Sequence, residues 1–334
     1  MTNEISIIIP VRNRKAYTQQ ILSQLYQQIS PVDLEQISVV VVDDGSTDGT
    51  QSIIRTQFSR VHLLQGDGSL WWTGAICLGM EYARDKLAPN YFVWLNDDIV
   101  LAEDFISQLK AVCASPISCN SVIGGIVLDQ TYPDWVVFSG MMNKQLIRSM
   151  DYFSTKETIE VDALNGNIAI IPRMVVDQIG LPNQDRFRHY GGDFEFIMRA
   201  KNSGYPVILS SKLQATTDYQ VSDFIRYMPP WMQWYVATDN FHRKKILQGF
   251  TNLKCHYNIW HMVNINHYEV QAIPAWKYSL FYLRQIAKLL SSSFWRSSQV
   301  QVSINDYFDQ QNAPAAIIAA VFKEKSREKA AVNR

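Results

Sequence analysis

Short runs of apolar, mostly β-branched residues alternate with segments of helical spacing over the first two thirds of the chain. Hydrophobicity that is continuous within a run, rather than alternating, is typical of strands covered on both faces. Strands of this kind are expected at residues 6–11, 37–44, 60–64, 91–98, 121–128, 167–172 and 206–210. The pattern therefore predicts an α/β fold with a mostly parallel central sheet flanked by helices.

The segments between these runs predict helices. Leu22 and Leu25 follow the first strand at helical spacing, and apolar residues recur within 76–87 at intervals of four, three and four. After about residue 215 the apolar runs stop, and the chain becomes rich in aromatic, basic and helix-compatible residues. We expect a sheet domain over residues 1–215 and a helical extension over residues 216–334.

Composition is that of an ordinary globular protein. The chain has 334 residues, of which 47% are hydrophobic and 19% charged, enough for one large core or two moderate ones. The formal net charge is zero, but residues 1–239 hold 18 basic and 26 acidic residues, whereas residues 240–334 hold 13 and 5. The two parts are expected to do different jobs, and no nucleic-acid partner is predicted.

No export signal or membrane span is predicted. The N-terminus, MTNEISIIIPVRNR, lacks a basic start, a following apolar stretch and a cleavage site. The longest uncharged apolar run near the end, residues 314–322, is far shorter than the roughly 20 residues that a span needs. The cysteines show no zinc-site spacing and are expected to be reduced, which predicts a cytoplasmic protein. They are Cys77, Cys113, Cys119 and Cys255.

Acidic residues follow two of the predicted strands, where parallel sheets bind ligands. Asp43 and Asp44 lead into a turn through Gly45 and Ser46. A carboxylate here accepts hydrogen bonds from a nucleobase or from ribose hydroxyls. The alternative is that Asp44 and Ser46 only form a turn and cap the next helix.

The second acidic segment is Asn96, Asp97 and Asp98, directly after a buried strand. Adjacent carboxylates repel each other, and either protonation or a cation relieves that repulsion. Mg²⁺ or Mn²⁺, held by one or two carboxylates and by substrate phosphate oxygens, fits this pattern. The alternative is a strand-ending turn that leads to a helix near Glu103 and Asp104.

A third segment, HYGGDFEFIMRAKNSGYPVIL, places Asp193 and Glu195 at the start of a predicted helix. The helix dipole and the free N–H groups are expected to favour the ionised form of Asp193. An ionised carboxylate is what a general base requires. The alternative is a helix cap at Asp193 beside an exposed Glu195.

Together and in this order, these motifs resemble the family 2 glycosyltransferases with the GT-A fold. The matching pieces are IIIPVRNR, VVVVDDGSTDGT, GDGSLWWTGAICLG, FVWLNDDIVL, LNGNIAIIPR and GGDFEFIMRAKNSGYP, which cover roughly residues 4–215. The resemblance implies a GT-A catalytic domain in which residues 1–98 bind a nucleotide-sugar and residues 99–215 form the acceptor and catalytic half.

The resemblance also assigns roles to particular residues. The implied nucleotide-binding residues are Pro10, Arg12, Asp43, Asp44, Gly45, Ser46, Asp67 and Gly68. The implied sugar and acceptor pocket is formed by Trp71, Trp72, Asn96, Asp97, Gly166, Asn167, His189 and Tyr190. Arg12 stands where relatives often carry an aromatic residue, and its planar guanidinium is also able to stack on a base.

The metal ligand implied by the resemblance is Asp98, the third position of the family's DxD motif, in which Asn96 replaces the first aspartate. Asp218 stands where some members place a further ligand, a histidine. Asp193 matches the catalytic base, with Glu195 as its near neighbour. The implied reaction is inverting transfer of a sugar from a nucleotide-sugar, with Mg²⁺ or Mn²⁺ as cofactor.

The implied donor is dTDP-rhamnose or a UDP-sugar, and the implied acceptor is a surface glycan or a polyprenyl-linked saccharide. An inactive GT-A scaffold and a sugar-nucleotide pyrophosphorylase are the alternatives, although IIIPVRNRKAY lacks the glycine-rich phosphate loop expected of the latter. A nicotinamide-binding fold fits poorly, because Trp71 occupies the third glycine position of G-x-G-x-x-G.

The segment GDGSLWWTGA raises the question of what two adjacent tryptophans do in a glycine-rich loop. If a helix begins at about Thr73, Trp71 and Trp72 point in different directions. One ring then packs under the loop and the other forms a wall of the sugar pocket, and Trp72 is the preferred wall. The alternative is that both rings are buried in the core.

The helical extension contains one amphipathic segment of special interest. Trp276, Leu280, Leu283 and Ala287 fall on one helical face, with basic residues nearby. This pattern is typical of a helix that lies on an anionic membrane surface, here the inner face of the cell membrane. The alternative is packing against the catalytic domain or a second subunit, which leaves a homodimer open.

Overall fold

The computed structural model describes residues 4–237, 239–269, 272–292 and 297–322. The chain divides into two compact units, Met1–Asp218 and Tyr219–Arg334.

The first unit is built on a ten-stranded sheet with the order β10-β13-β6-β12-β4-β1-β2-β3, to which β5 adds beside β13 and β7 beside β6. The strands are β1 (Ile5–Val11), β2 (Ile37–Asp43), β3 (His62–Gln65), β4 (Tyr91–Leu95), β5 (Val100–Leu101), β6 (Val122–Asp129), β7 (Val136–Phe138), β10 (Thr158–Glu160), β12 (Ile168–Pro172) and β13 (Val207–Thr217). The seven strands predicted from the hydrophobic runs are all present.

The central strands are parallel, as predicted: β1 pairs with β2 and β4, β2 with β3, and β6 with β13. Among the seven predicted strands, β12 departs from this pattern and runs antiparallel to both β4 and β6. The short strands β5, β7 and β10 also pair antiparallel with their neighbours. Three short strands, β8 (Gly140–Met142), β9 (Gln145–Leu146) and β11 (Ala163–Leu164), form a separate small sheet. Strands of two or three residues are too short to produce a readable sequence pattern.

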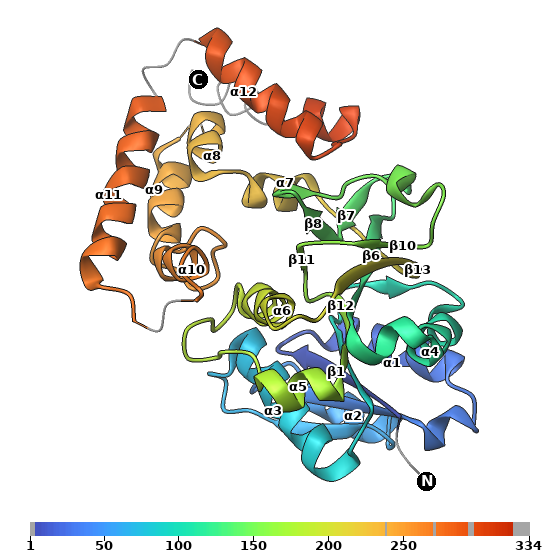
Figure 1. Ribbon diagram of the computed structural model, residues 1–334. Coiled ribbons are helices and arrows are strands. Elements are labelled where there is room, and N and C mark those ends of the chain that lie inside the picture. Colours follow the sequence, from blue (N-terminus) through green and yellow to red (C-terminus); the bar gives the residue numbers. More distant parts are fainter. Residues whose placement is uncertain (1–3, 238, 270–271, 293–296, 323–334) are drawn as a thin grey trace. The chain divides into compact units, whose positions relative to one another are not determined.

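Helices cover both faces of the sheet, which explains why its strands are continuously apolar (Figure 1). Ile7 and Ile9 face a core shared with α1 (Lys15–Gln28), α2 (Thr50–Gln57) and α4 (Phe105–Ala114). Ile8 faces the opposite core, shared with α3 (Trp71–Tyr82), α5 (Arg173–Ile179) and α6 (Gly192–Asn202). Short helical turns lie at Asp33–Glu35, Ala83–Leu87, Pro116–Asn120 and Met150–Phe153.

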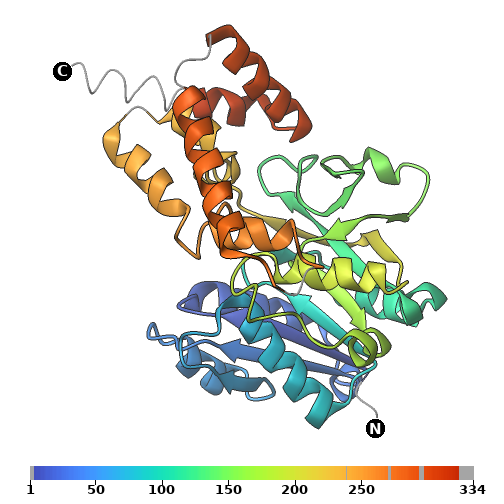
Figure 2. The same cartoon turned by 60° about the vertical axis from the view of Figure 1, so that its left-hand side comes forward.

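The second unit is helical. It contains α7 (Val221–Tyr227), α8 (Pro230–Val236), α9 (Asn240–Gly249), α10 (Ile259–Ile265), α11 (Ala275–Ser292) and α12 (Ser297–Gln310). Within this unit α11 packs against α8 and α10, as can be followed in Figure 2. None of the helices that the structure describes is both long and apolar enough to cross a membrane.

Candidate functional site

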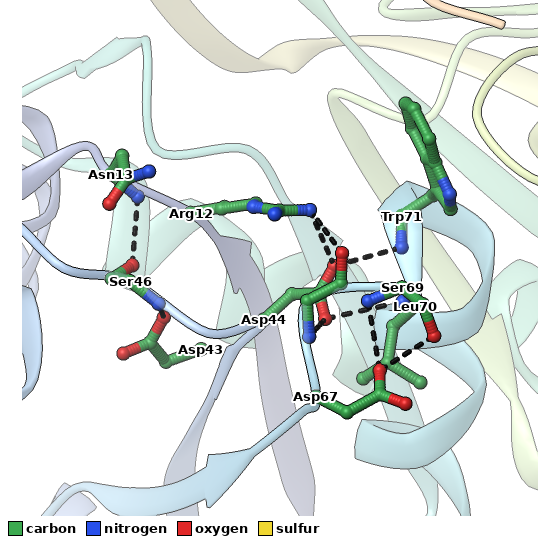
Figure 3. Close-up of polar contacts among 10 residues, drawn as sticks. Arg12, Asn13, Asp43, Asp44, Ser46, Asp67, Ser69, Leu70 and Trp71 are labelled. Atoms are coloured by element: carbon green, nitrogen blue, oxygen red, sulfur yellow. Dashed lines mark hydrogen bonds and ion pairs between the residues drawn. The ribbon is translucent and has the colours of Figure 1, made fainter.

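Asp44 holds the glycine-rich loop against the end of β2. Its carboxylate accepts backbone N–H groups from Gly68 at 2.8 Å, Leu70 at 3.2 Å and Trp71 at 3.1 Å (Figure 3). Hydrogen bonds to an ionised acceptor are among the stronger ones in proteins, so a single buried side chain fixes this turn. Asp44 therefore acts as an anchor for the loop, a role that neither of its two sequence interpretations included.

Arg12 reaches the same loop from the end of β1. Its Nη1 donates to the Gly68 carbonyl and lies 3.6 Å from Asp44 Oδ2 (Figure 3). Gly45 adopts a left-handed backbone (φ 71°), and a Cβ there would lie 3.0 Å from the Gly68 nitrogen. The strand end and the loop approach so closely that only glycine fits at this turn.

Asp43 is fully buried beside this turn. Its Oδ1 accepts the Ser46 N–H at 2.9 Å, and Ser46 Oγ accepts the Asn13 N–H at 2.8 Å (Figure 3). Within the described part of the chain, no hydrogen-bond donor reaches the other oxygen of Asp43. An unpaired buried acceptor is costly, which favours a donor group from a ligand or from water at this point.

The remaining predicted nucleotide-binding residues are Pro10 and Asp67, which lie near this turn. Pro10 lies in β1 opposite Val42 of β2. Asp67 is exposed, and its Oδ1 accepts both the N–H of Ser69 at 2.8 Å and its hydroxyl at 2.6 Å. These bonds lower the pKa of Asp67. The structure thus gathers most of the predicted nucleotide residues at the ends of β1 and β2, with Asp67 on the outer rim.

The paired carboxylates after β4 do meet a cation, and it is Arg14. Its Nε lies 3.2 Å from Asp97 Oδ1, and its Nη2 lies 3.0 Å from Asp98 Oδ2. Burial raises the pKa of Asp97 to about 7 although Arg14 opposes the shift. Thr18 Oγ1 lies 3.4 Å from the second oxygen of Asp97. Asp97 therefore faces α1, whereas Asp98 remains partly exposed.

Asp98 and Asp218 lie at neighbouring strand ends. β13 pairs antiparallel with β5, with Thr216 opposite Val100, and Asp218 directly follows Thr217, the last residue of β13. Thr217 Oγ1 donates to the Asp98 carbonyl at 3.1 Å. Among the described residues, no group of three or more His, Cys, Asp or Glu side chains is placed so that it could hold a metal ion. Two carboxylates fit Mg²⁺ or Mn²⁺ when phosphate and water oxygens complete the shell.

Asp193 lies in the first turn of α6, after the left-handed Gly191 (φ 81°) that occupies the cap position. Its Oδ2 accepts the Gly166 N–H and its Oδ1 accepts the Phe194 N–H, both at 2.8 Å. Burial raises the pKa of Asp193, although these backbone N–H groups act in the opposite direction. The N–H groups at the helix terminus do favour the ionised form, as expected, but desolvation outweighs them and the net shift of the pKa is upward.

Glu195 has a structural partner. It is only 5% exposed, and its Oε1 lies 2.7 Å from Nε of Arg199, one helical turn later. Arg199 also donates to the carbonyls of Ile179, the last residue of α5, and of Leu181, just after that helix. The alternative of an exposed Glu195 was wrong, and its carboxylate orients Arg199 instead of facing the Asp193 cluster.

Trp72 links the two halves of the site. Its Nε1 donates to Asn96 Oδ1 at 2.9 Å, and its ring meets Trp94 edge-on at a centroid distance of 5.5 Å. Asn96 Nδ2 in turn donates to Asn167 Oδ1. The ring also lies against Gly166, the residue whose N–H binds Asp193. Trp72, Asn96, Asn167 and Gly166 thus form one cluster beside Asp193.

Trp71 points elsewhere. Its ring packs on His189 at 5.6 Å, and His189 meets Tyr190 at 4.7 Å. The helix begins at Trp71 rather than near Thr73, and Trp71 has a left-handed backbone (φ 59°). The two rings therefore lie against different partners, as predicted, and both remain partly exposed rather than forming core.

Sequence reasoning missed Arg14 and Arg199. Arg14 belongs to the quoted IIIPVRNR motif, so its position was visible, but the motif does not reveal that β1 lies next to β4. Glu195 and Arg199 are four residues apart on a predicted helix, and this spacing is typical of an ion pair. The sequence alone could therefore have predicted their contact.

Comparisons with known proteins show which proteins this chain is similar to. Residues 6–155 match the family model described as Glycosyl transferase family 2. Glycosyltransferase AglE of Haloferax volcanii is 26% identical over 211 residues, 60% of this chain and 62% of that protein. Validoxylamine A glucosyltransferase of Streptomyces hygroscopicus subsp. jinggangensis is 28% identical over 123 residues, 36% of this chain and 28% of that protein. The chain spans less than two thirds of either relative.

Two solved structures share the fold. Mannosyltransferase PcManGT of Pyrobaculum calidifontis, in complex with GDP-Man and Mn²⁺, aligns with a TM-score of 0.50 and 14% identity over 93% of this chain and 86% of its own. GalNAc-T7 with UDP, GalNAc and Mn²⁺ aligns with a TM-score of 0.51 and 15% identity over 82% and 58%. Residues 6–155, somewhat under half of the chain, are thus similar to family 2 glycosyltransferases, and the first unit has the GT-A fold.

Proposed function

We propose that this glycosyltransferase is an inverting enzyme that moves a sugar from a nucleoside-diphosphate sugar to a hydroxyl group of a growing glycan. The observation that carries the proposal is the setting of Asp193. Burial raises the pKa of its carboxylate, the residue as a whole is only partly buried, and it lies beside the cluster that contains Asn96, which is followed directly by Asp97 and Asp98. A candidate base and a candidate diphosphate site thus share one connected framework.

In the proposed reaction Asp193 accepts the proton of the acceptor hydroxyl while that oxygen attacks the anomeric carbon. A new carbon–oxygen bond forms as the bond to the diphosphate breaks, and the electron pair leaves with the nucleoside diphosphate. A base with a raised pKa suits this task, because proton transfer is most efficient when the pKa approaches the working pH. Inversion follows from a single displacement without a covalent enzyme intermediate.

The leaving group requires positive charge. Asp98 and Asp218 are the residues that would hold Mg²⁺ or Mn²⁺, and such an ion, when bound, neutralises charge on the departing diphosphate. Arg14 would continue to balance Asp97, because it already contacts both carboxylates of the segment. The Mn²⁺ in the two solved relatives supports this choice of ion.

The nucleotide is proposed to lie at the ends of β1 and β2, over Arg12 and the turn of residues 43–46. The solved relatives were studied with GDP-mannose and with UDP, which supports a nucleoside-diphosphate donor. Within that class we propose dTDP-rhamnose or a UDP-sugar. The ring of Trp72 is proposed as a wall of the sugar pocket, since an aromatic face suits the C–H surface of a sugar.

The acceptor is proposed to be a surface glycan or a polyprenyl-linked saccharide, reached at the inner face of the cell membrane through α11. Trp276 and Leu283 of this helix are 61% and 63% exposed. The helix also carries Lys277, Arg284 and Lys288 and no acidic residue. Exposed apolar and basic side chains on one helix favour an anionic bilayer surface. Co-sedimentation with vesicles that is independent of anionic lipid would contradict this assignment.

The test is a panel of nucleotide-sugars, each measured for thermal stabilisation and for hydrolysis with and without Mn²⁺. Asp193→Asn is expected to lower turnover by about a hundredfold to ten-thousandfold, as expected for loss of a general base. Asp98→Ala is expected to abolish the dependence on Mn²⁺ and most activity. Asp134→Asn, an exposed carboxylate of the same unit, is the matched control and should behave as the parent. Equal activity in all four proteins would overturn the site.

A further inference from the structure

A cavity of about 490 Å³ lies within the C-terminal unit, apart from every residue assigned above. Its walls come from α7, α8 and α9, which follow one another in the chain, and from Tyr257. Cavities of about 300–1,000 Å³ are the usual size of sites for small organic ligands. This cavity therefore has room for a ligand of its own.

The polar side of the cavity is positively charged. Arg226, His242 and Lys245 line it, and none of its described lining residues is acidic. His242 Nδ1 lies 2.6 Å from Asp239 Oδ2, so this imidazole has an acidic partner outside the lining. Lys245 Nζ lies 4.4 Å from the centre of the Phe241 ring, a neutral contact that leaves its charge intact.

Two neutral groups contact Arg226. Its Nη2 donates to the Lys254 carbonyl at 3.3 Å, and its guanidinium lies 5.8 Å from the centre of the Tyr227 ring. A guanidinium fork and a nearby ammonium are the groups that proteins use to bind phosphate. The charge of the cavity thus favours an anionic head group over a neutral one.

The opposite side of the cavity is apolar. Ile225, Val236 and Ile246 contribute aliphatic side chains. Tyr257 contributes its ring, because its hydroxyl is turned to the Ile246 carbonyl at 3.2 Å. A free inorganic anion would leave these walls without a partner, whereas an apolar group attached to the anion would cover them.

We propose that this cavity binds an amphipathic anion, in which Arg226 and Lys245 hold a phosphate group and the aliphatic wall accepts an apolar body. Such a ligand is either a soluble phosphate ester or the phosphate end of a membrane lipid. The cavity shares no lining residue with the candidate glycosyltransferase site, so this proposal does not rest on the proposed donor or base.

The test is isothermal titration of the full chain with decyl phosphate below its micellar concentration. Octyl glucoside, which is neutral, and inorganic phosphate, which has no apolar part, are the comparison probes. We expect saturable one-to-one binding of decyl phosphate and at least tenfold weaker binding of the other two. If octyl glucoside bound as tightly as decyl phosphate, the cavity would not require an anionic head group. If inorganic phosphate bound as tightly, the cavity would not require an apolar body.

Variants locate the binding. Lys245→Ala and Arg226→Ala are each expected to weaken decyl phosphate about tenfold or more, because each removes a charged donor to the phosphate. Lys244→Ala removes a neighbouring exposed lysine that does not line the cavity and should leave binding unchanged. Both lysines are exposed, so these variants are expected to fold. Equal losses in Lys244→Ala and Lys245→Ala would overturn the site.

Vesicles distinguish the two sources. Displacement of decyl phosphate by vesicles of phosphatidic acid in phosphatidylcholine, but not by phosphatidylcholine alone, would assign the cavity to a lipid phosphate. Binding of decyl phosphate that depends on Lys245 but resists both kinds of vesicle would assign it to a soluble phosphate ester. Absence of any binding that depends on Lys245 would overturn the proposal in either form.

Discussion

Gly166 lies where the candidate base meets the tryptophan pair, and replacing it with alanine tests that contact directly. A Cβ at this position would lie 2.6 Å from Trp72 Cζ2 and 3.1 Å from Asp193 Cβ. Carbon atoms in contact normally stand about 3.5–4.0 Å apart. The Trp72 ring is held by its bond to Asn96 and by Trp94, so it has little freedom to yield.

The cost of Gly166→Ala follows from these distances. Overpacking a well-filled site costs about 1–3 kcal/mol, and loss of the Trp72 bond to Asn96 adds about 1 kcal/mol if the ring moves. Together these two effects should lower the free energy of unfolding by about 2–4 kcal/mol. Turnover should fall by about a hundredfold, since displacement of a catalytic group by about 1 Å has that effect.

A double-mutant cycle in urea identifies the clash. Trp72→Leu removes the ring atoms that Gly166→Ala would strike, so the double variant should be more stable than the sum of the single effects predicts. We expect a coupling free energy of about 1–2 kcal/mol. Gly192→Ala is the control partner, because a Cβ there would meet Thr73 instead of Trp72. Additivity within about 0.5 kcal/mol for Gly166 and Trp72 would refute the contact.

Three further predictions concern individual carboxylates. Glu195→Gln should lower the free energy of unfolding in urea by about 2 kcal/mol, because it breaks a largely buried pair with Arg199; an unchanged value would contradict that role. Since the active form of Asp193 is ionised and its pKa is raised, kcat/KM should increase with pH above the ordinary carboxyl range; a flat profile from pH 4.5 to 8 would exclude Asp193 as the base. Asp44→Asn should cost about 1–3 kcal/mol and raise KM for the donor, because the amide cannot accept all three loop N–H groups; an unchanged KM would separate the loop from donor binding.

Much of the sheet could be predicted from sequence because its strands are buried on both faces. Ile7, Ile8 and Ile9 are all fully buried although they point to opposite sides, which is what a continuous apolar run encodes. The same run carries no information on direction. The antiparallel course of β12 depends on how the chain returns after the small sheet, and the residues of β12 do not differ from those of a parallel strand.

The sequence predicted which types of residue form the candidate site, but it did not predict which residues contact each other there. The repulsion between Asp97 and Asp98 predicted either protonation or a cation, and that prediction needs only the local sequence. The identity of the cation is not local, because Arg14 reaches them only through the pairing of β1 with β4. The pKa of Asp193 is a similar case, since burial of its carboxylate depends on the whole surrounding fold.

The two tryptophans show how local and distant effects combine. A left-handed backbone at a bulky residue costs on the order of 1–2 kcal/mol, and at Trp71 the bond from its N–H to Asp44 helps to offset that cost. The bend at Trp71 starts the helix two residues earlier than expected and sends the next ring, that of Trp72, toward Gly166 and Asp193. The Asp44 carboxylate at the end of β2 anchors this turn. The conformation of the proposed nucleotide loop and the position of the Trp72 ring therefore depend on each other. A donor that tightens the loop around Asp44 would therefore also fix Trp72 beside the base.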